Sequence, residues 1–292
     1  MIAWVSGIYD EPALYELACA YRDIPAEVTA LQAWCATHHA GHVRSVLELA
    51  AGPAEHAREF ARRGVLATAL DRSPAMCGYA AAQAESAGVA LAVIEGDMRD
   101  FRIADSGGGP VRFDLAVTML NSLCHLFTLD DLVRHLAAVR AHLAPGGLYI
   151  AELAHPADFF AAEPRTSNEW VIDADGVHAD VHWGGKGDRI DPLTQVTREH
   201  MSITATAKDG TIRTVSDVVP NRFWTLTEVT AAVALANTGL ADAGLANTGL
   251  AGPGCAGGYE LVATYGDFDD ATPLDAPTAW RMILILQAAG TG

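Results

Sequence analysis

Residues 46–56 read VLELAAGPAEH, and this stretch decides the fold class. An apolar run carries one carboxylate, Glu48, and then breaks into small residues around Gly52 and Pro53 before a helical pattern begins. A buried strand, a tight turn and a helix follow one another in this way at nucleotide-type sites. The small turn lets a ligand approach the backbone closely, and the helix N-terminus offers it free N–H groups.

Strands and helices alternate after this stretch. Apolar runs typical of strands end at Asp71 and near Asp97, and two more are FDLAVTM at 113–119 and LYIAEL at 148–153. Helical patterns lie between them, and Ser73 is expected to cap the helix that follows Asp71. Five short apolar strands separated by helices predict a parallel, doubly wound α/β sheet.

Changes of pattern divide the chain into four predicted segments. Residues 1–44 are predicted to form a helical lid and residues 45–163 a Rossmann-like core. Residues 164–222 hold two predicted antiparallel hairpins and should form a β insertion over one end of the sheet. Residues 223–292 are predicted to complete the core with a helix and two late strands. Within them, the tandem near-copy LANTGLADAG and LANTGLAGPG at 235–254 is interpreted as a lengthened surface loop.

The composition argues against several classes of partner and compartment. The net charge of −17 predicts repulsion from nucleic acid and from anionic membranes. The five cysteines are scattered and never in C-x-x-C spacing, so neither a disulfide framework nor a metal site is expected. We see no basic leader and no apolar run of about 18 residues, and therefore expect a cytoplasmic protein without a membrane span.

The order of these motifs resembles that of class I S-adenosylmethionine-dependent methyltransferases. The first motif of that family is an acid followed by three spaced glycines, and here the matching residues are Glu48, Ala50, Gly52 and Ala54. A dinucleotide fingerprint, G-x-G-x-x-G, fits the same positions poorly. The acid Asp71, then EGDMRDF, FDLAVTMLNSLCHL and LAPGGLYI, match the later motifs in order.

The resemblance covers about residues 45–153. It implies a Rossmann-like, seven-stranded methyltransferase sheet and S-adenosylmethionine as the cofactor. The lid and the insertion are more weakly similar to amino-sugar N-methyltransferases and to glycine N-methyltransferase-like enzymes.

The same resemblance implies roles for residues at the strand ends. Glu48 is expected to fix the amino-acid end of the cofactor, Gly52 to leave room for its methionine portion, and Asp71 to accept the ribose hydroxyls. Asp97 is expected at the adenine amino group, with the Met98 backbone at the ring edge. The further residues predicted at the cofactor are Tyr9, Tyr21, Ala50, Arg72, Met119 and Asn121. Structural alternatives stay open, since the acids could serve as strand-end, cap or turn residues and the tyrosines could pack between helices.

The acceptor is expected beyond the carboxyl ends of strands four and five, beneath the lid and the insertion. His155, which follows Glu152 at the end of strand five, is the best candidate base because imidazole titrates near neutral pH. His125 and Glu152 are the other catalytic candidates, although packing against the sheet would explain His125 equally well.

Aromatic and histidine residues of the insertion leave two questions open. His178 and His182 should share one strand face, but no third metal ligand can be placed beside them. Trp183 and Trp224 could line the acceptor pocket or pack in the core.

The sequence therefore predicts a methyltransferase that acts on a nitrogen or oxygen atom of a small molecule in specialised metabolism. A homodimer is a possible assembly. Two alternatives remain, since fold does not fix function. The same fold could serve an elimination or a cyclisation, which the alanines at Ala50 and Ala54 keep open. It could also form a non-catalytic partner subunit.

Overall fold

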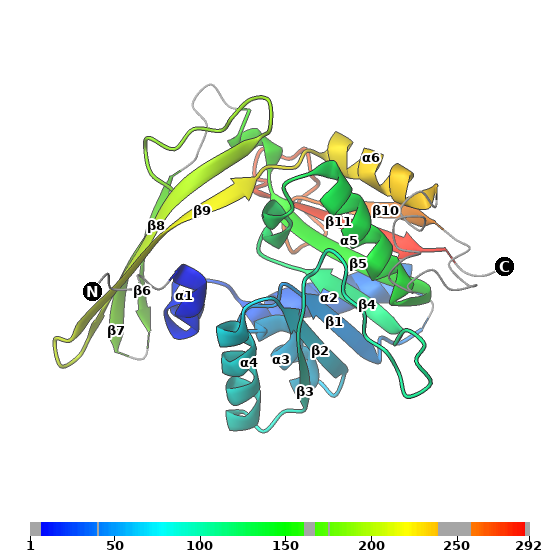
Figure 1. The fold of residues 1–292 in the computed structure, drawn as a ribbon, viewed down its shortest axis with the longest axis horizontal. Coiled ribbons are helices and arrows are strands. Elements are labelled where there is room, and N and C mark those ends of the chain that lie inside the picture. Colours follow the sequence, from blue (N-terminus) through cyan, green and yellow to red (C-terminus); the bar gives the residue numbers. More distant parts are fainter. Residues whose placement is uncertain (1–6, 40, 161–166, 175, 239–257, 290–292) are drawn as a thin grey trace.

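Two sheets make up the protein in the computed structural model, which describes residues 7–39, 41–160, 167–174, 176–238 and 258–289 (Figure 1). The larger sheet has seven strands in the order β10-β11-β5-β4-β1-β2-β3, and the smaller has four in the order β6-β7-β8-β9. The predicted fold class, a doubly wound seven-stranded sheet with an antiparallel insertion, is confirmed. Residues 239–257, which hold most of the tandem near-copy, lie outside the described residues.

The elements have the following bounds. The larger sheet contains β1 (Ser45–Leu49), β2 (Leu66–Asp71), β3 (Leu91–Glu95), β4 (Phe113–Thr118), β5 (Leu143–Ala154), β10 (Tyr259–Tyr265) and β11 (Arg281–Ala288). The smaller sheet contains β6 (Asn168–Ala174), β7 (Val177–Trp183), β8 (Val196–Ala207) and β9 (Ile212–Arg222). The helices are α1 (Pro12–Ala18), α2 (Ile24–His38), α3 (Glu55–Arg62), α4 (Pro74–Ser86), α5 (Leu129–Ala141) and α6 (Leu226–Asn237), with 3-10 turns η1 (Ile8–Asp10), η2 (Ser122–His125) and η3 (Pro156–Asp158).

The strand order of the larger sheet places a topological switch point at its centre. Strand β1 pairs in parallel with β2 on one side and with β4 on the other, while β11 runs antiparallel to both β5 and β10. The chain moves outward from β1 to β3 and then returns to β4. Ligands of open α/β sheets bind at the carboxyl ends of the strands where the order reverses, which here means β1 and β4.

Local sequence signals explain where the helices begin. The Ser73 hydroxyl accepts a hydrogen bond from the backbone N–H of Met76 at 3.3 Å, as the sequence predicted. Thr128 and Thr225 each form a capping box with an acid three residues later, at the start of α5 and α6. These caps satisfy backbone donors that a helix otherwise leaves unpaired.

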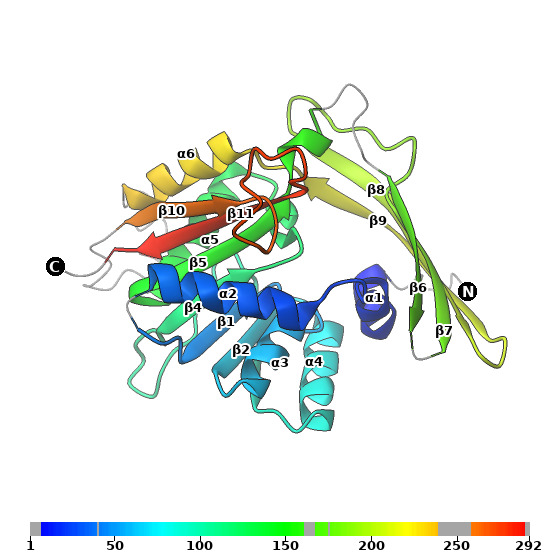
Figure 2. The same ribbon diagram turned by 180° about the vertical axis from the view of Figure 1, so that it is seen from behind.

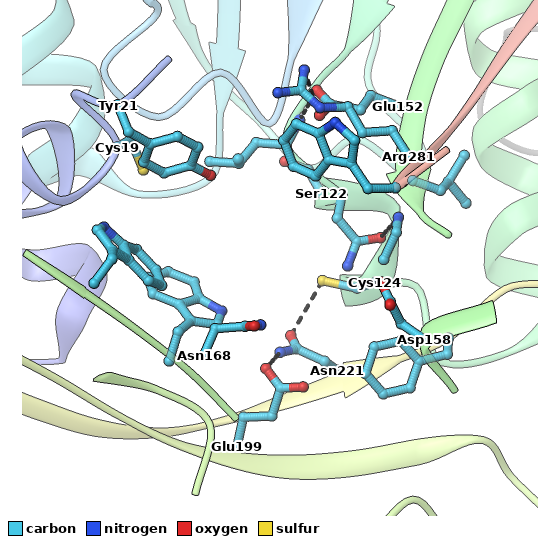
Figure 3. Close-up of a pocket in the computed structure, with 18 of the residues that line it drawn as sticks. Cys19, Tyr21, Ser122, Cys124, Glu152, Asp158, Asn168, Glu199, Asn221 and Arg281 are labelled. Carbon is cyan, nitrogen blue, oxygen red and sulfur yellow. Dashed lines mark hydrogen bonds and ion pairs between the residues drawn. The ribbon is translucent and has the colours of Figure 1, made fainter. Parts of the chain in front are cut away.

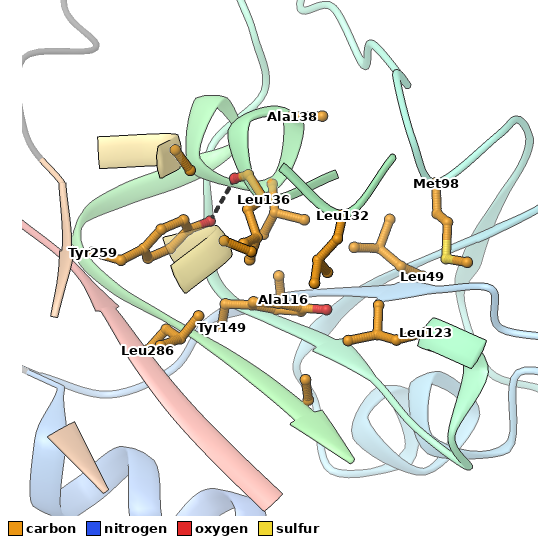
Figure 4. Packing of buried hydrophobic residues seen from close by; sticks show 14 of the residues in the cluster. Leu49, Met98, Ala116, Leu123, Leu132, Leu136, Ala138, Tyr149, Tyr259 and Leu286 are labelled. Carbon is orange, nitrogen blue, oxygen red and sulfur yellow. Dashed lines mark hydrogen bonds between the residues drawn. The ribbon is translucent and has the colours of Figure 1, made fainter. Parts of the chain in front are cut away.

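Each face of the larger sheet has its own hydrophobic layer. Leu47 and Leu49 of β1 pack with residues of α5 and α6 on one face, where the Tyr259 hydroxyl donates to the Leu136 carbonyl at 3.0 Å (Figure 4). Val46 packs on the opposite face with residues of α2 and α3. Because both faces are covered, the sheet is rigid and its strand ends provide a fixed platform for a site.

The N-terminal segment is divided between the two sheets. Helix α2 covers the larger sheet, and its Trp34 stacks on Tyr265 with ring centroids 4.5 Å apart. Helix α1 instead lies beside the smaller sheet (Figure 2). Ile8 of η1 and Leu14 and Ala18 of α1 pack with the inner apolar residues of that sheet. Among the described elements of the N-terminal segment, η1 and α1 therefore occupy the place expected of a lid. The predicted segment boundaries stay predictions.

Candidate active site

The turn after β1 adopts the conformation that its small residues allow. Ala50, Gly52 and Ala54 all have left-handed backbone angles, with φ of 49°, 52° and 57°. The Gly52 N–H donates to the Asp71 carboxylate at 2.7 Å, which joins the turn to the end of β2. The two alanines therefore keep the geometry of a glycine turn, although a left-handed L-residue costs about 1–2 kcal/mol.

Glu48 lies beneath this turn and is buried. Its carboxylate accepts a hydrogen bond from the N–H of Ala57 at 2.7 Å, inside the first turns of α3. The other carboxylate oxygen lies 3.4 Å from Nδ1 of His56. Burial alone would lower the pKa of His56, but its hydrogen bonds with Glu27 and Glu48 raise that pKa to about 9. The Glu48 carboxylate thus fixes the turn to α3, and its predicted contact with the cofactor stays a prediction.

A network of buried charges continues from His56 to the end of β5. His56 contacts Glu27 at 2.9 Å, and Arg22 bridges Glu27 and Glu152 at 2.6 and 2.7 Å. Arg281 approaches the same two acids at 3.2 and 3.4 Å. Although burial opposes ionisation, hydrogen bonds from His56 and Arg22 lower the pKa of Glu27 to about 2. Since Glu152 also accepts the N–H of Leu120 at 2.8 Å, its carboxylate is occupied by protein donors and holds the backbone in place.

Two buried guanidinium nitrogens of this network, Nη1 of Arg22 and Nε of Arg281, have no hydrogen-bond partner within the described residues. Arg22 lines a small space over the turn together with Gly52 and Met119. A guanidinium with a free N–H edge binds a carboxylate well, so the residues present fit the amino-acid end of S-adenosylmethionine.

Residues at the ends of β2 and β3 lie near this turn. The two Asp71 oxygens accept the N–H groups of Gly52 and Ser73 at 2.7 and 2.8 Å, and burial raises the pKa of Asp71. Asp97 forms a two-pronged contact with Arg99 at 3.0 and 2.6 Å. Arg72 is exposed, whereas Met98 is buried and its carbonyl contacts His135 at 2.8 Å. These placements are compatible with the predicted ribose and adenine contacts, which stay predictions.

A larger cavity of about 640 Å³ lies next to the turn, between the ends of β4 and β5, helix α1 and the smaller sheet (Figure 3). Four residues, Tyr15, Cys19, Leu120 and Ser122, line both this cavity and the small space over Gly52. The two spaces therefore adjoin, and these four residues separate or connect them as a common boundary.

Two left-handed residues shape the boundary between the spaces. Leu120 and Asn121 have φ of 51° and 57° directly after β4. This conformation turns the Leu120 N–H toward Glu152 and lets the Asn121 side chain accept the N–H of Ala154 at 3.1 Å. Consecutive non-glycine residues in this region are strained, which is characteristic of functional sites.

Tyr9 and His125 form one polar pair of the cavity lining. The Tyr9 hydroxyl and Nε2 of His125 share a hydrogen bond of 3.1 Å, and their rings meet edge to face. Burial, together with the positive charge of Arg72, lowers the pKa of His125 to about 4. At neutral pH this imidazole is uncharged, and the Tyr9 hydroxyl and the backbone of Pro220 hold its ring at the cavity wall.

Glu199 is a second polar group of the lining, and it was missed by the sequence analysis. It lies on the inner face of β8, accepts a hydrogen bond from the Asn221 side chain at 2.6 Å, and is 6% exposed. Cys124 contacts the same Asn221 at 3.2 Å. Burial raises the pKa of Glu199 to about 7, against the lowering effect of Asn221. One feature of the sequence could have indicated it. Glu199 stands between Thr197 and Met201 at every second position of a strand, so all three side chains point to the same, inward face.

His155 does not lie where the sequence analysis expected the base. Its Nε2 contacts the Leu274 carbonyl at 2.9 Å, and its Nδ1 accepts the N–H of Ala157 at 3.2 Å. It is not among the described residues that line the cavity. Because both ring nitrogens are used by backbone groups, the structure gives no support to His155 as the base, and the carboxylate of Glu152 is held by Arg22 and Arg281.

The aromatic candidates divide between cavity and core. Tyr21 and Trp183 line the cavity, and Tyr21 meets Trp170 edge to face. Trp224 is buried in the core instead, where its indole N–H donates to the Leu123 carbonyl at 3.1 Å.

The described residues bring together no three histidine, cysteine or acid side chains suited to a metal ion. His178 and His182 are both exposed on β7, beside Asp173 and Glu169 respectively. A search of the described helices also found none that is long and apolar enough to cross a membrane.

Residues 46–147 match the family model of a methyltransferase domain. This segment contains the turn, Asp71 and Asp97, and it lies within the seven-stranded sheet described above. The chain therefore contains a methyltransferase domain, and its fold is the one shared by solved S-adenosylmethionine-dependent methyltransferases.

The individual relatives include enzymes of amino sugars. The dTDP-3-amino-3,4,6-trideoxy-alpha-D-glucopyranose N,N-dimethyltransferase of Streptomyces venezuelae is 27% identical over 174 residues, which cover 60% of this chain and 66% of the relative, slightly under two thirds of its length. A methyltransferase from Clostridium acetobutylicum shares the fold with a TM-score of 0.69 at 16% identity, covering 94% of this chain and 96% of that one. An S-adenosylmethionine-bound amino pentose methyltransferase from Micromonospora echinaspora, involved in calicheamicin biosynthesis, has a TM-score of 0.64 at 20% identity, covering 92% and 95%.

Proposed function

We propose that this enzyme transfers a methyl group from S-adenosylmethionine to the amino group of a small-molecule acceptor, such as an amino sugar, in specialised metabolism. The observation that carries the proposal is that the two spaces adjoin and share the lining residues Tyr15, Cys19, Leu120 and Ser122. Nitrogen is favoured over oxygen because the Streptomyces venezuelae relative is an N,N-dimethyltransferase.

The proposed roles follow from the positions of the side chains. S-adenosylmethionine, when bound, supplies an activated methyl group. Arg22 would hold its carboxylate, Gly52 would admit its methionine portion, and Asp71 would accept the ribose hydroxyls. Tyr9 and His125 would position the acceptor, and the buried walls would exclude water. Catalysis then rests mainly on alignment, since the methyl donor is already reactive.

The test of this function is product detection. The purified protein is incubated with S-adenosylmethionine and a panel of free and nucleotide-linked amino sugars, each paired with its hydroxyl counterpart. Mass spectrometry should detect S-adenosylhomocysteine together with an acceptor heavier by one or two methyl groups. Cofactor binding without turnover on any acceptor would contradict the proposal and would favour the repurposed fold.

The ribose role of Asp71 has its own test. S-adenosylmethionine and S-adenosylhomocysteine carry the same ribose, so Asp71→Ala should weaken both by a similar factor of about ten. Calorimetry on the two ligands measures this. A loss confined to one ligand would contradict the role.

The homodimer stays a separate prediction, to be checked by light scattering.

A further inference from the structure

We propose that Glu199 of strand β8 is the acceptor-recognition residue, a carboxylate that binds the substrate amine as its ammonium ion and takes a proton from it. This inference rests on the proposed function and specifies its substrate class. It concerns a side chain of the smaller sheet, away from the motifs that define the cofactor turn.

The geometry around Glu199 leaves room for a cation. The carboxyl is buried and receives one hydrogen bond, from Asn221, within the described residues. Within the described part of the chain no Lys, Arg or His forms an ion pair with Glu199, whereas the buried Glu27 and Glu152 pair with Arg22 and the buried Glu48 pairs with His56. Buried carboxylates are normally paired, because burying an isolated charge is costly. An ammonium ion entering the cavity would supply the missing partner.

Asn221 gives the carboxyl a fixed orientation. Its amide donates to one Glu199 oxygen, while its own oxygen faces the Cys124 thiol at 3.2 Å, so the amide cannot easily rotate (Figure 3). Glu199 and Asn221 stand at inward positions of adjacent strands, since Glu199 pairs with Val219 across the β8–β9 ladder. Preorganisation of this kind favours a ligand with a defined hydrogen-bond direction.

The charges on the cavity wall also favour the binding of a cation. The acids that line it are Glu152, Asp158, Glu169 and Glu199, and the one arginine among its described lining residues, Arg281, is already paired with Glu27 and Glu152. A cavity lined by acids concentrates cations. The acceptor therefore enters as a protonated amine.

The proton balance is straightforward. One N–H bond of the ammonium breaks, its electron pair stays on nitrogen as the lone pair, and the proton moves to the free oxygen of Glu199. The neutral amine then has the lone pair that attack on a methyl carbon requires. Asn221 of β9 is the hydrogen-bond partner of Glu199, and the titratable groups that interact with it electrostatically are Cys124 of η2, Asp188 of the loop before β8 and Tyr9 of η1. A pKa near 7 suits this exchange at neutral pH.

The binding test uses two ring compounds of one shape, cyclohexylamine, which is protonated at pH 7.5, and cyclohexanol. Each is titrated by calorimetry or NMR into the protein loaded with S-adenosylhomocysteine. The wild type should bind the amine at least about tenfold more tightly than the alcohol. Glu199→Gln should reduce this preference to within about twofold. Glu199→Asp, which keeps the charge, should retain it in part.

A matched control is Asp180→Asn, the same acid-to-amide change at an exposed residue of β7. It should leave the amine preference intact, and the S-adenosylhomocysteine affinity of every variant should remain at the wild-type value. Absence of measurable amine binding, equal binding of both probes by the wild type, or a preference that survives Glu199→Gln would each overturn the inference.

Turnover separates this inference from the proposed function. With any acceptor that yields product, Glu199→Gln should raise KM and remove the rise of kcat/KM near pH 7. An unchanged pH profile would overturn the role of Glu199 while methyl transfer stands. An amine preference in a protein that forms no product would instead contradict the proposed function and support the binding role of Glu199.

Discussion

Glu152 and Glu199 face the same cavity from opposite sides, one at the end of a core strand and one on the smaller sheet (Figure 3). Glu152 contacts Arg22 at 2.7 Å and Arg281 at 3.4 Å, and also accepts a backbone N–H. Glu199 instead accepts a hydrogen bond from the uncharged side-chain amide of Asn221. The comparison shows that an acid in a cavity is informative only with its partners, because a paired carboxylate organises the protein whereas an unpaired one is available to a ligand.

The strongest test of this contrast removes the charge from the paired acid. Glu152→Gln removes one of the two acids paired with Arg22 and one of the three paired with Arg281, in a buried site. We expect the free energy of unfolding to fall by about 3–5 kcal/mol, as for other broken buried ion pairs. Urea denaturation measures the change, with exposed Asp180→Asn expected to stay within about 0.5 kcal/mol of the wild type. Equal stability of Glu152→Gln and the wild type would refute the structural role.

The second test sharpens the assignment of the core side to the cofactor. Gly52→Val adds a branched side chain at a left-handed position, in the space over the turn. The affinity for S-adenosylmethionine should fall by about 100-fold in calorimetry, through strain and lost space together. Gly64→Val is the matched control, since Gly64 is also left-handed, with φ of 82°, but lies at the end of α3. Normal affinity in Gly52→Val would mean that the cofactor binds elsewhere.

The third test uses pH to examine the paired charges. The pKa of His56 is raised from 6.5 to about 9, so its contribution to stability is complete below about pH 6.5 and is lost as pH rises through 9. Between pH 7.5 and 9 the free energy of unfolding of the wild type should therefore fall more steeply than that of His56→Gln. The difference in slope should be up to about 1.4 kcal/mol per pH unit. Denaturation curves at several pH values give both slopes. If the free energy of unfolding changed with pH at the same rate in the wild type and in His56→Gln, the proposed stabilisation of protonated His56 by Glu27 and Glu48 would be wrong.

The smallest effect is expected at His155. Because its ring nitrogens contact Leu274 and Ala157 outside the cavity, His155→Ala should change turnover by less than about threefold at any pH. Loss of the two contacts should cost about 1 kcal/mol of stability. A decrease of turnover by a factor of a hundred that is recovered at high pH would restore His155 as the base.

The sequence was sufficient for the fold but only partly for the site. Period-two and helical patterns, the Ser73 cap and the turn around Gly52 are local signals, and each corresponds to an element that the structure confirms. The partners of a side chain are not local. Glu152 and Arg22 are 130 residues apart, and Asn221 reaches Glu199 across a hairpin, so no spacing rule could show which acid was paired and which was available.

His155 illustrates the same limit from the other side. A histidine after the last residues of a central strand is a reasonable candidate, because strand ends converge on the site. The carbonyl that engages it belongs to Leu274, 119 residues later in the chain. The local sequence pattern correctly predicted strand β5, but it contained no information about where the imidazole ring of His155 points.

The left-handed alanines of the cofactor turn have a consequence for how this motif varies. Glycine at Ala50 or Ala54 would relieve about 1–2 kcal/mol of steric cost in the folded chain. It would also give the unfolded chain more conformational entropy, worth about 0.5–1 kcal/mol in the opposite direction. The entropic contribution offsets about half of the steric one. The turn can therefore exchange glycine for alanine at a net cost of about 0–1.5 kcal/mol, and its dihedral angles identify the motif better than its residue types do.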